Sequence, residues 1–218
     1  MPRATVERQG LLLVVSGPSG VGKGTVIRGV MARHPEVKLS VSCTTRPPRP
    51  GEVDGQDYHF VSVEEFEAMR EAGELLEWAV VHGDIFYGTP RKPVEEAIAR
   101  GEDMILEIDY QGARSVRGLL GRRAVLVFIA PPSWDALLER LRKRHTERPE
   151  EVAKRLESAR REIAHINMFE YVVVNDVLEE AVDALEAILV AERTRLGRLK
   201  WERLAEAILA DAEAGGGR

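Results

Sequence analysis

Residues 11–25, Leu-Leu-Leu-Val-Val-Ser-Gly-Pro-Ser-Gly-Val-Gly-Lys-Gly-Thr, decide the fold class. The apolar run at 11–15 predicts a buried strand, and an amphipathic helix is expected directly after the loop. Gly17 and Gly22 are five residues apart and Lys23 follows at once, which is the spacing of a phosphate-binding loop. The glycines let backbone N–H groups turn toward phosphate oxygens, and the lysine adds a positive charge. The stretch therefore predicts a binding loop for a nucleoside triphosphate.

The loop departs from the strict pattern, because Gly24 stands where Ser or Thr normally follows the lysine. Thr25 comes one residue later, about 100° further around a helix, so its hydroxyl is a weak candidate ligand for Mg²⁺. The residues expected to bind the triphosphate are Gly17, Pro18, Ser19, Gly20, Val21, Gly22, Lys23, Gly24 and Thr25. The loop alone leaves motor proteins, GTPases, ABC-type ATPases and nucleotide kinases open.

Outward from the loop, short apolar runs alternate with amphipathic stretches along the chain. Further buried strands are predicted at 104–108, 124–129 and 171–174. Helices are predicted at roughly 24–33, 90–100, 110–120, 133–143, 149–166 and 177–210. This alternation predicts an α/β fold in which helices cover both faces of a parallel sheet.

Residues 37–88 break the alternation. They contain short strand-like runs at 37–43, 57–61, 75–81 and 85–88, and Ser62-Val-Glu-Glu65 is a capping box that opens a helix ending near Ala72. The segment predicts a small mixed α+β subdomain inserted into the core. The expected division of this single domain is a core of 8–36, 89–138 and 164–210, the inserted subdomain at 37–88, a lid region at 139–163 with a mobile flap at 144–150, and a frayed tail at 211–218.

Composition narrows the class further. The 218 residues include 44% hydrophobic and 31% charged residues, which argues against wholesale disorder, and the single cysteine excludes an intrachain disulfide framework. No apolar span approaches the roughly 20 residues of a membrane helix, so a cytoplasmic protein without a membrane partner is expected. The net charge of −5 gives no general attraction to nucleic acid. Basic residues nevertheless cluster at 38–50 and 139–161, which predicts discrete anion sites; the alternative for the second cluster is a solvated helix face.

The first basic cluster lies within residues 40–58, Ser-Val-Ser-Cys-Thr-Thr-Arg-Pro-Pro-Arg-Pro-Gly-Glu-Val-Asp-Gly-Gln-Asp-Tyr. Arg46 and Arg49 flank two prolines that stiffen the loop, so both guanidinium groups could grip one phosphate. The Tyr58 hydroxyl could add a further contact. The competing interpretation is an exposed Arg-Pro loop without a ligand.

At this point the sequence resembles the guanylate kinase family. The resemblance rests on GPSGVGKGT, SVSCTTRPPRPGEVDGQDYHFVSVEEF, LLEWA, FYGTP, LEIDYQGA, IAPPS, AKRL and VVVND, in that order from about residue 11 to 194. It implies a P-loop core with a parallel sheet, a GMP-binding subdomain and an ATP lid. It also implies transfer of the γ-phosphoryl group of ATP to GMP, with Mg²⁺ carried as MgATP.

The resemblance implies roles for individual residues. It assigns Arg46, Arg49, Tyr58 and Tyr87 to the GMP phosphate, Ser42, Glu77, Thr89 and Asp109 to guanine, Asn175 to the adenine side, and Lys23, Arg46, Arg140, Arg144 and Arg155 to the transferring phosphoryl group. Guanine chemistry agrees, because its N1–H and N2–H₂ donors suit carboxylates and its O6 suits a hydroxyl. Glu107 or Asp109 could serve Mg²⁺ through water. Residues 83–88 are one residue longer than the common family form, which leaves Phe86 open as an alternative to Tyr87.

The expected mechanism needs no general base, since the acceptor phosphate is already largely dianionic near pH 7. Alignment of the two substrates and neutralisation of phosphate charge would accelerate the reaction.

Two alternative functions are another nucleoside monophosphate kinase, such as an adenylate kinase, and a non-catalytic guanylate-kinase-like interaction module. The first does not account for the 40–52 stretch, and the second typically lacks an intact P-loop. The sequence leaves the use of dGMP and the oligomeric state open.

Overall fold

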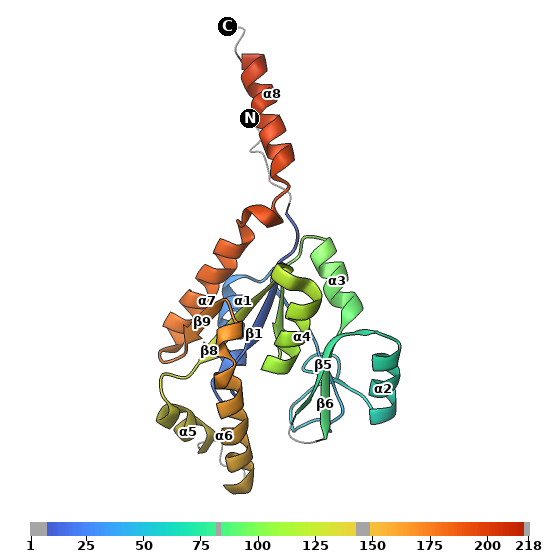
Figure 1. Ribbon diagram of the computed structural model, residues 1–218, viewed down its shortest axis with the longest axis vertical. Coiled ribbons are helices and arrows are strands. Elements are labelled where there is room, and N and C mark those ends of the chain that lie inside the picture. The colour runs from blue at the N-terminus through green and yellow to red at the C-terminus, as the bar shows by residue number, and fades with distance from the viewer. Residues whose placement is uncertain (1–7, 82–83, 143–148, 216–218) are drawn as a thin grey trace.

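A computed structural model describes residues 8–81, 84–142 and 149–215. Its core is a five-stranded parallel sheet in the order β2-β7-β1-β8-β9 (Figure 1). The strands are β1 (Leu12–Ser16), β2 (Lys38–Leu39), β7 (Met104–Glu107), β8 (Ala124–Ala130) and β9 (Tyr171–Val174). The parallel α/β sheet predicted from the alternating pattern is confirmed.

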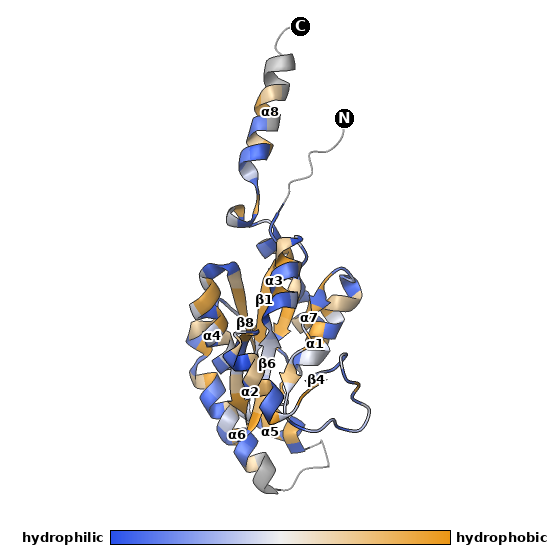
Figure 2. Ribbon diagram, turned by 90° about the vertical axis from the view of Figure 1, so that its right-hand side faces the viewer, coloured by the Kyte–Doolittle hydropathy of each residue, from blue (hydrophilic) through white to orange (hydrophobic). Residues whose placement is uncertain are grey.

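Alternate residues of β1 point into two separate apolar layers, as the two-residue repeat of a strand requires. Leu13 and Val15 pack in a layer with α1 (Lys23–Arg33) and α7 (Leu178–Arg193). Leu12 and Val14 pack in the opposite layer, with α3 (Arg91–Ala99) and α4 (Tyr110–Leu120). Figure 2 shows the apolar strands between these helices. Burial on both faces explains why the strands are continuous apolar runs.

The inserted subdomain forms its own four-stranded sheet in the order β4-β3-β6-β5. Its elements are β3 (Cys43–Thr44), β4 (His59–Phe60), α2 (Val63–Glu71), β5 (Leu75–Val81) and β6 (Ile85–Pro90). Phe66 and Leu75 fill a small core beneath the sheet. The predicted capping box is present, since Ser62 Oγ accepts from Glu65 N and Glu65 accepts in turn from Ser62 N.

The expected boundaries of this subdomain need correction. Residues 38–39 pair with β7 in the core sheet, so the run at 37–43 does not belong wholly to the insertion. At the other end, β6 pairs with β5 as far as Pro90, two residues beyond the expected limit. The register is decided by partners distant in sequence, which is why the local pattern misplaced both limits.

The single long helix predicted at 177–210 is also wrong. The structure has α7, a short 3-10 helix (Leu196–Arg198) and then α8 (Trp201–Gly215). The chain turns between the helices because Arg198 O accepts a hydrogen bond from Gln9 N at 2.9 Å and Leu199 bridges to Arg8. The amphipathic periodicity continues across this turn, and so the break leaves little trace in the sequence.

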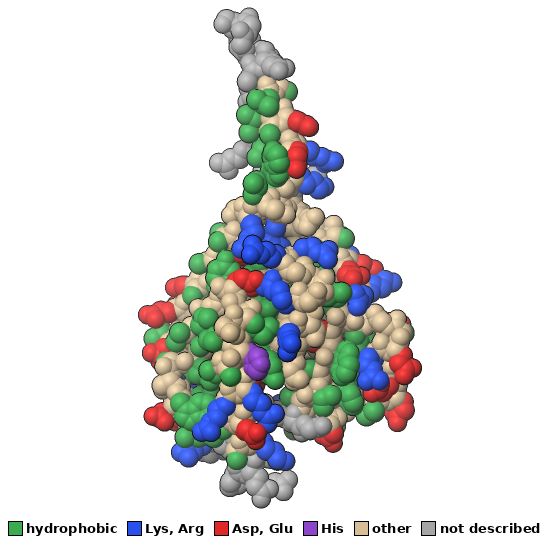
Figure 3. All heavy atoms as spheres, viewed as in Figure 1, with side chains coloured by type: hydrophobic (Ala, Val, Ile, Leu, Met, Phe, Trp, Pro, Cys, Tyr) green, Lys and Arg blue, Asp and Glu red, His purple; other side chains and the backbone are tan. Residues whose placement is uncertain are grey.

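Helix α8 extends away from the core in Figure 1 and has apolar side chains along one side in Figure 3. The helix continues to Gly215, so residues 211–215, expected in a frayed tail, are helical; residues 216–218 lie outside the described part. Across the ranges described, none of the helices is both long and apolar enough to span a membrane.

Two more helices complete the fold near the loop that follows β1. These are α5 (Trp134–Arg142) and α6 (Pro149–Ala164), which correspond to the predicted lid region. The flap expected at 144–150 lies largely outside the described residues, and its last two residues begin α6.

Candidate active site

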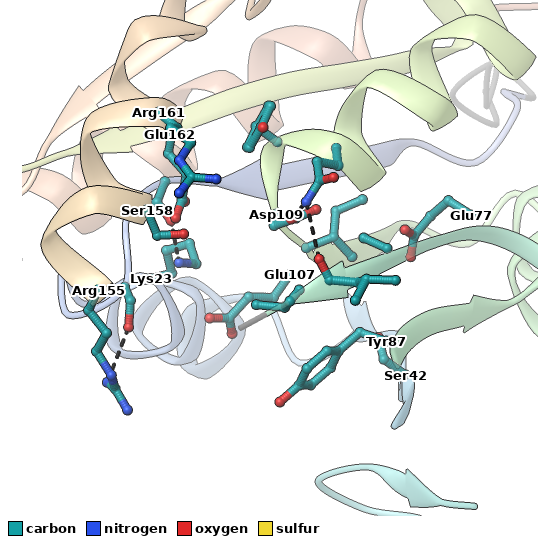
Figure 4. A pocket seen from close by; sticks show the side chains of 18 of the residues that line it. Lys23, Ser42, Glu77, Tyr87, Glu107, Asp109, Arg155, Ser158, Arg161 and Glu162 are labelled. Atoms are coloured by element: carbon teal, nitrogen blue, oxygen red, sulfur yellow. Dashed lines mark hydrogen bonds between the residues drawn. The ribbon is translucent and has the colours of Figure 1, made fainter. Parts of the chain in front are cut away.

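A cavity of about 570 Å³ lies between the P-loop, the inserted subdomain and α6. Its lining includes Gly17, Ser19 and Lys23 from the P-loop, Ser42, Arg49, Tyr58, Glu77 and Tyr87 from the inserted subdomain, Glu107 and Asp109 from the end of β7, and Arg155, Ser158 and Glu162 from α6. Figure 4 shows Lys23 and the α6 residues at one end of this cavity and Glu77, Tyr87 and Ser42 at the other. The cavity therefore connects the P-loop with the part of the inserted subdomain in which the sequence predicts a second phosphate site.

The P-loop owes its shape to glycines with positive φ angles. Gly17, Gly20 and Gly22 have φ values of 142°, 85° and 95°, which L side chains rarely adopt. A Cβ atom at Gly17 would lie 2.2 Å from Ile129 O, and one at Gly22 would lie 2.6 Å from Asn175 Nδ2. The loop leads directly from β1 into α1, as the strand–loop–helix prediction required.

The Asn175 side chain is hydrogen-bonded to the backbone of the P-loop. The side chain is 6% exposed, and its Nδ2 donates to Val21 O at 2.7 Å. This contact fixes a loop carbonyl and accounts for the glycine at 22, which leaves room for the amide. A direct contact between Asn175 and adenine stays a prediction.

Cationic side chains gather against the P-loop. Lys23 Nζ donates to Gly17 O at 2.5 Å and to Pro18 O at 3.3 Å. Arg140 Nη1 donates to Val21 O at 3.4 Å, and Arg155 Nη1 donates to Ser19 Oγ at 3.3 Å. Arg155 lines the cavity but Arg140 does not, and Arg144 lies outside the described residues. Helices α5 and α6 thus bring positive charge to the loop from a distant part of the chain.

The residues proposed to serve Mg²⁺ have different surroundings. Thr25 is exposed, accepts a hydrogen bond from Arg28 at 3.3 Å and is absent from the cavity lining. Asp109 accepts from Gly112 N and from Gln111 Nε2, both at 2.9 Å, so both of its oxygens have partners while it caps α4. Glu107, in contrast, lies over the loop: a Cβ atom at Gly24 would be 3.2 Å from its Oε2.

The subdomain end of the cavity is built from side chains held by one another. Arg46 is 8% exposed and donates to both oxygens of Glu52, at 2.6 and 2.7 Å, and to Tyr87 Oη at 3.1 Å. Its guanidinium also lies 4.9 Å from the Tyr58 ring centroid. The hydrogen bonds from Arg46 lower the pKa of Glu52 to about 2, and those to Glu52 raise the pKa of Arg46. Glu52 is a site residue that the sequence reasoning missed, although it lies within the diagnostic 40–58 stretch.

The choice between Phe86 and Tyr87 is decided by the alternation of β6. Phe86 packs against Phe66 in the subdomain core, with ring centroids 5.3 Å apart. Tyr87 points the other way, lines the cavity and lies edge-on to Tyr58 at 5.9 Å. Tyr87 is therefore the residue of the two that faces the cavity.

Glu77 is the buried carboxylate of the cavity. It is 5% exposed, and Thr89 Oγ1 donates to its Oε1 at 2.6 Å. Burial raises the pKa of Glu77 to about 7, and the nearby charge of Asp109 acts in the same direction. Thr89 is fully buried and does not line the cavity, so its observed contact is with Glu77. Gly112, which the sequence reasoning missed, makes room for this carboxylate: a Cβ atom there would lie 2.4 Å from Glu77 Oε2.

Comparison with known proteins identifies the family of this chain. A model of the guanylate kinase family matches residues 9–192. The chain belongs to the guanylate kinase family. A guanylate kinase of Nocardia farcinica is 54% identical over 189 residues, covering 86% of this chain and 97% of the relative. One of Symbiobacterium thermophilum is also 54% identical, over 87% of this chain and 89% of the relative.

The fold of a solved guanylate kinase is also similar. The crystal structure of the enzyme from Anaplasma phagocytophilum is 37% identical, with a TM-score of 0.77, covering 92% of this chain and 95% of that one. The P-loop core and inserted subdomain expected from the family resemblance are thus present. The family match ends within α7, so α8 lies beyond it.

In this member of the guanylate kinase family, ten of the expected site residues, including Gly17 and Ser19 of the P-loop, line one cavity. Lys23, Ser42, Arg49, Tyr58, Glu77, Tyr87, Asp109 and Arg155 line it, whereas Arg46, Thr89, Arg140 and Asn175 lie behind that lining and contact the residues or loop that form it. The first group faces the cavity, and the second group holds the first group or the P-loop in place.

Proposed function

We propose that this enzyme transfers the γ-phosphoryl group of ATP to GMP, giving ADP and GDP. The single observation that carries the proposal is one cavity with a P-loop lysine, Lys23, at one end and a buried carboxylate, Glu77, at the other. A phosphate site formed by Arg49, Tyr58 and Tyr87 lies along the same cavity. A monophosphate with its base toward Glu77 would present its phosphate to the P-loop side.

The base end suits guanine. Ionised Glu77 would accept hydrogen bonds from N1–H and N2–H₂, and Ser42 would donate to O6. Adenine has no such pair of donors, so it would leave a buried carboxylate without partners at a cost of about 1–3 kcal/mol. Asp109 would supply a second acceptor, and Thr89 would act through Glu77, which it already contacts.

The chemistry would follow from alignment and charge. The acceptor oxygen of the monophosphate is already largely ionised near pH 7, and no side chain needs to remove a proton from it. Lys23 would balance charge on the β- and γ-phosphates, while Arg155 and Arg46 would approach the transferring group from the two sides of the cavity. Closure of the inserted subdomain and of the lid region toward each other would exclude water and limit ATP hydrolysis.

Mg²⁺ fits the donor set at the P-loop end. When bound with ATP it would neutralise phosphate charge. Glu107 would hold it, because this carboxylate occupies the space above Gly24, where the usual P-loop hydroxyl is missing. The contact would run through water, as is common for Mg²⁺. The hydrogen bonds to Asp109 and the exposed position of Thr25 make these two weaker candidates than they were from sequence.

Two alternative functions would not require these features. Another nucleoside monophosphate kinase would not need Glu77 in its base site, and a non-catalytic interaction module would not need the glycine geometry around Lys23.

We also propose that the enzyme acts in the cytoplasm, in purine nucleotide metabolism and GMP recycling, with small nucleotides rather than nucleic acid or membranes as partners.

A coupled assay of ADP release tests the proposal. The full chain would be given MgATP with GMP, dGMP, AMP, CMP or UMP in turn, and omission of Mg²⁺ would test the metal. GMP should give the highest kcat/KM, exceeding that for AMP by about fivefold to 150-fold, because an unpartnered buried carboxylate costs about 1–3 kcal/mol. Equal rates with AMP and GMP would contradict the assignment of Glu77, and binding of nucleotides without turnover would favour the interaction module.

A further inference from the structure

Glu52 lies behind the proposed phosphate site, and the proposed reaction gives it no task. It does not line the cavity, and its side chain is 19% exposed. Pro50 and Gly51 form the centre of a turn that is closed by a hydrogen bond of 3.0 Å from Glu52 N to Arg49 O. Gly51 has the positive φ angle, 88°, that suits the third position of such a turn. The turn brings the carboxylate back to Arg49, whose backbone N–H donates to Glu52 Oε2 at 2.8 Å.

The same carboxylate holds the guanidinium group of Arg46. Arg46 Nη1 and Nη2 donate to the two oxygens of Glu52 at 2.6 and 2.7 Å, which is the paired geometry of a strong arginine–carboxylate contact. Arg46 Nη1 also donates to Pro47 O at 3.0 Å, and Nε donates to Tyr87 Oη at 3.1 Å. Four of the five N–H donors of Arg46 are thus engaged by the protein, so at most one remains for a ligand.

Arg46 in turn contacts two tyrosines that line the cavity. Its guanidinium lies 4.9 Å from the Tyr58 ring centroid, and Tyr87 Oη accepts the hydrogen bond from its Nε. Because the Tyr87 oxygen accepts from Arg46, its own O–H hydrogen can donate toward the cavity, into which the side chain points in Figure 4. The position of Arg46 therefore sets the direction in which Tyr87 can donate.

We propose that Glu52 is the positioning residue of the phosphate site, which holds the Tyr87 hydroxyl through Arg46 and holds Arg49 through its backbone. The inference rests on the proposed function, because it takes the bound group to be the phosphate of GMP. Donors that are fixed before binding avoid the cost of ordering flexible side chains when the ligand arrives. Glu52 also neutralises part of the charge of Arg46, so its benefit is the fixed geometry and not a gain in positive charge.

The test compares the binding of GMP and of guanosine to the full chain by calorimetry. Glu52→Gln should weaken GMP binding about tenfold or more and leave guanosine binding within about twofold, because only the phosphate donors lose their support. Glu71→Gln is the matched control: it removes an exposed carboxylate from α2 of the same subdomain and should change neither affinity. Unchanged or tighter GMP binding by Glu52→Gln would overturn the proposal, because Glu52 would then only compete with the phosphate for Arg46.

A second background tests the route through Tyr87. Glu52→Gln should have a smaller effect on GMP binding beside Tyr87→Phe, because the hydroxyl that Glu52 positions is then missing. Equal effects in the two backgrounds would overturn this route.

Thermal unfolding identifies any loss that comes from misfolding, since Glu52→Gln leaves the charge of Arg46 buried without its partner. Glu52→Asp, which keeps the negative charge on a shorter side chain, is the second variant and should weaken GMP binding about threefold or more while sparing guanosine. Equal losses for the two ligands would overturn the proposal. If the wild type binds GMP without phosphorylating it, the proposed function fails while the comparison of GMP with guanosine still reports on Glu52.

Discussion

The two ends of the cavity, proposed to bind ATP and GMP, are built by different means. At the ATP end, positive-φ glycines shape a loop within nine consecutive residues, and the backbone forms the site. At the GMP end, Arg46, Glu52 and Tyr87 hold one another through side-chain hydrogen bonds that join β6 to the loop before β4. The first design depends on local conformation and the second on tertiary contacts. Substitutions in the P-loop should therefore remove most of the activity, whereas substitutions at the base end should lower kcat/KM for GMP by smaller amounts.

The largest expected effect is at the P-loop. Lys23→Met should lower kcat by about 10²–10³-fold or more, because the variant lacks the positive charge that would stabilise the transferring phosphoryl group. Stopped-time assays of ADP formation would measure the loss, and circular dichroism would show an intact fold. Lys92→Met, at an exposed position on α3, is the control and should be as active as the wild type. A Lys23→Met protein that is folded and fully active would contradict the P-loop assignment.

At the base end, Glu77→Gln should lower kcat/KM for GMP by about tenfold to 150-fold, since a charge-assisted hydrogen bond is worth about 1.5–3 kcal/mol. Glutamine keeps the size but presents an NH₂ group to the donors of guanine. The KM for ATP should barely change, because Glu77 lies at the other end of the cavity. A loss of less than twofold for GMP, or an equal loss for ATP, would return Glu77 to a structural role.

Two glycines of α4 test whether GMP use depends on the position of the Glu77 carboxylate. Gly112→Ala should lower kcat/KM for GMP by about tenfold or more, because the new methyl group would displace the Glu77 carboxylate and small displacements in a site are costly. Gly118→Ala is the matched control on the same helix, where nothing lies within 4 Å of the added atom. It should leave activity unchanged and stabilise the helix by about 0.5–1 kcal/mol. Equal activity of the two variants would show that Glu77 tolerates the displacement.

The pH dependence of GMP use should follow the ionisation of Glu77. Its pKa is about 7 in the free protein, and guanine needs the ionised form. As the pH falls from 8 to 6, the ionised fraction and hence kcat/KM for GMP should fall by about an order of magnitude. Comparison with Glu77→Gln removes the titration of GMP itself, so identical pH profiles would refute the assignment.

The same shift bears on stability. Because burial raises the pKa of Glu77, the folded state binds its proton more tightly than the unfolded state. The resulting contribution to the free energy of unfolding is present below the ordinary glutamate pKa and is lost as the pH rises through about 7. The Glu77→Gln variant should lack this part of the dependence.

The smallest effect is expected at Thr89. Thr89→Val removes the hydroxyl that donates to Glu77 but keeps the shape, so kcat/KM for GMP should fall by about twofold to tenfold at pH 7.5, from a hydrogen bond worth about 0.5–1.5 kcal/mol. The hydrogen bond lowers the pKa of Glu77, so its loss should move the pH profile to higher pH. Thr194→Val, at the end of α7, is the control. An unchanged profile would mean that Thr89 does not set the ionisation of Glu77.

The sequence by itself determined the features that are local. The P-loop spacing, the apolar strands and the capping box at Ser62 each depend on residues a few positions apart, and the structure confirms them as secondary structure and conformation. The family resemblance named eight of the residues that line the cavity, because its motifs preserve the order of chemical groups along the chain.

Only the tertiary structure decided which side chains face the cavity and which hold them. Glu52 and Gly112 have no distinctive local pattern. Glu52 holds Arg46 in the conformation that reaches Tyr87 on β6, and Gly112 makes room for Glu77, which lies on β5. The pairing of β2 with β7 and the turn before α8 likewise depend on partners far away in sequence. Local periodicity reports how a segment can fold, whereas burial, charge pairing and register arise only when distant segments meet.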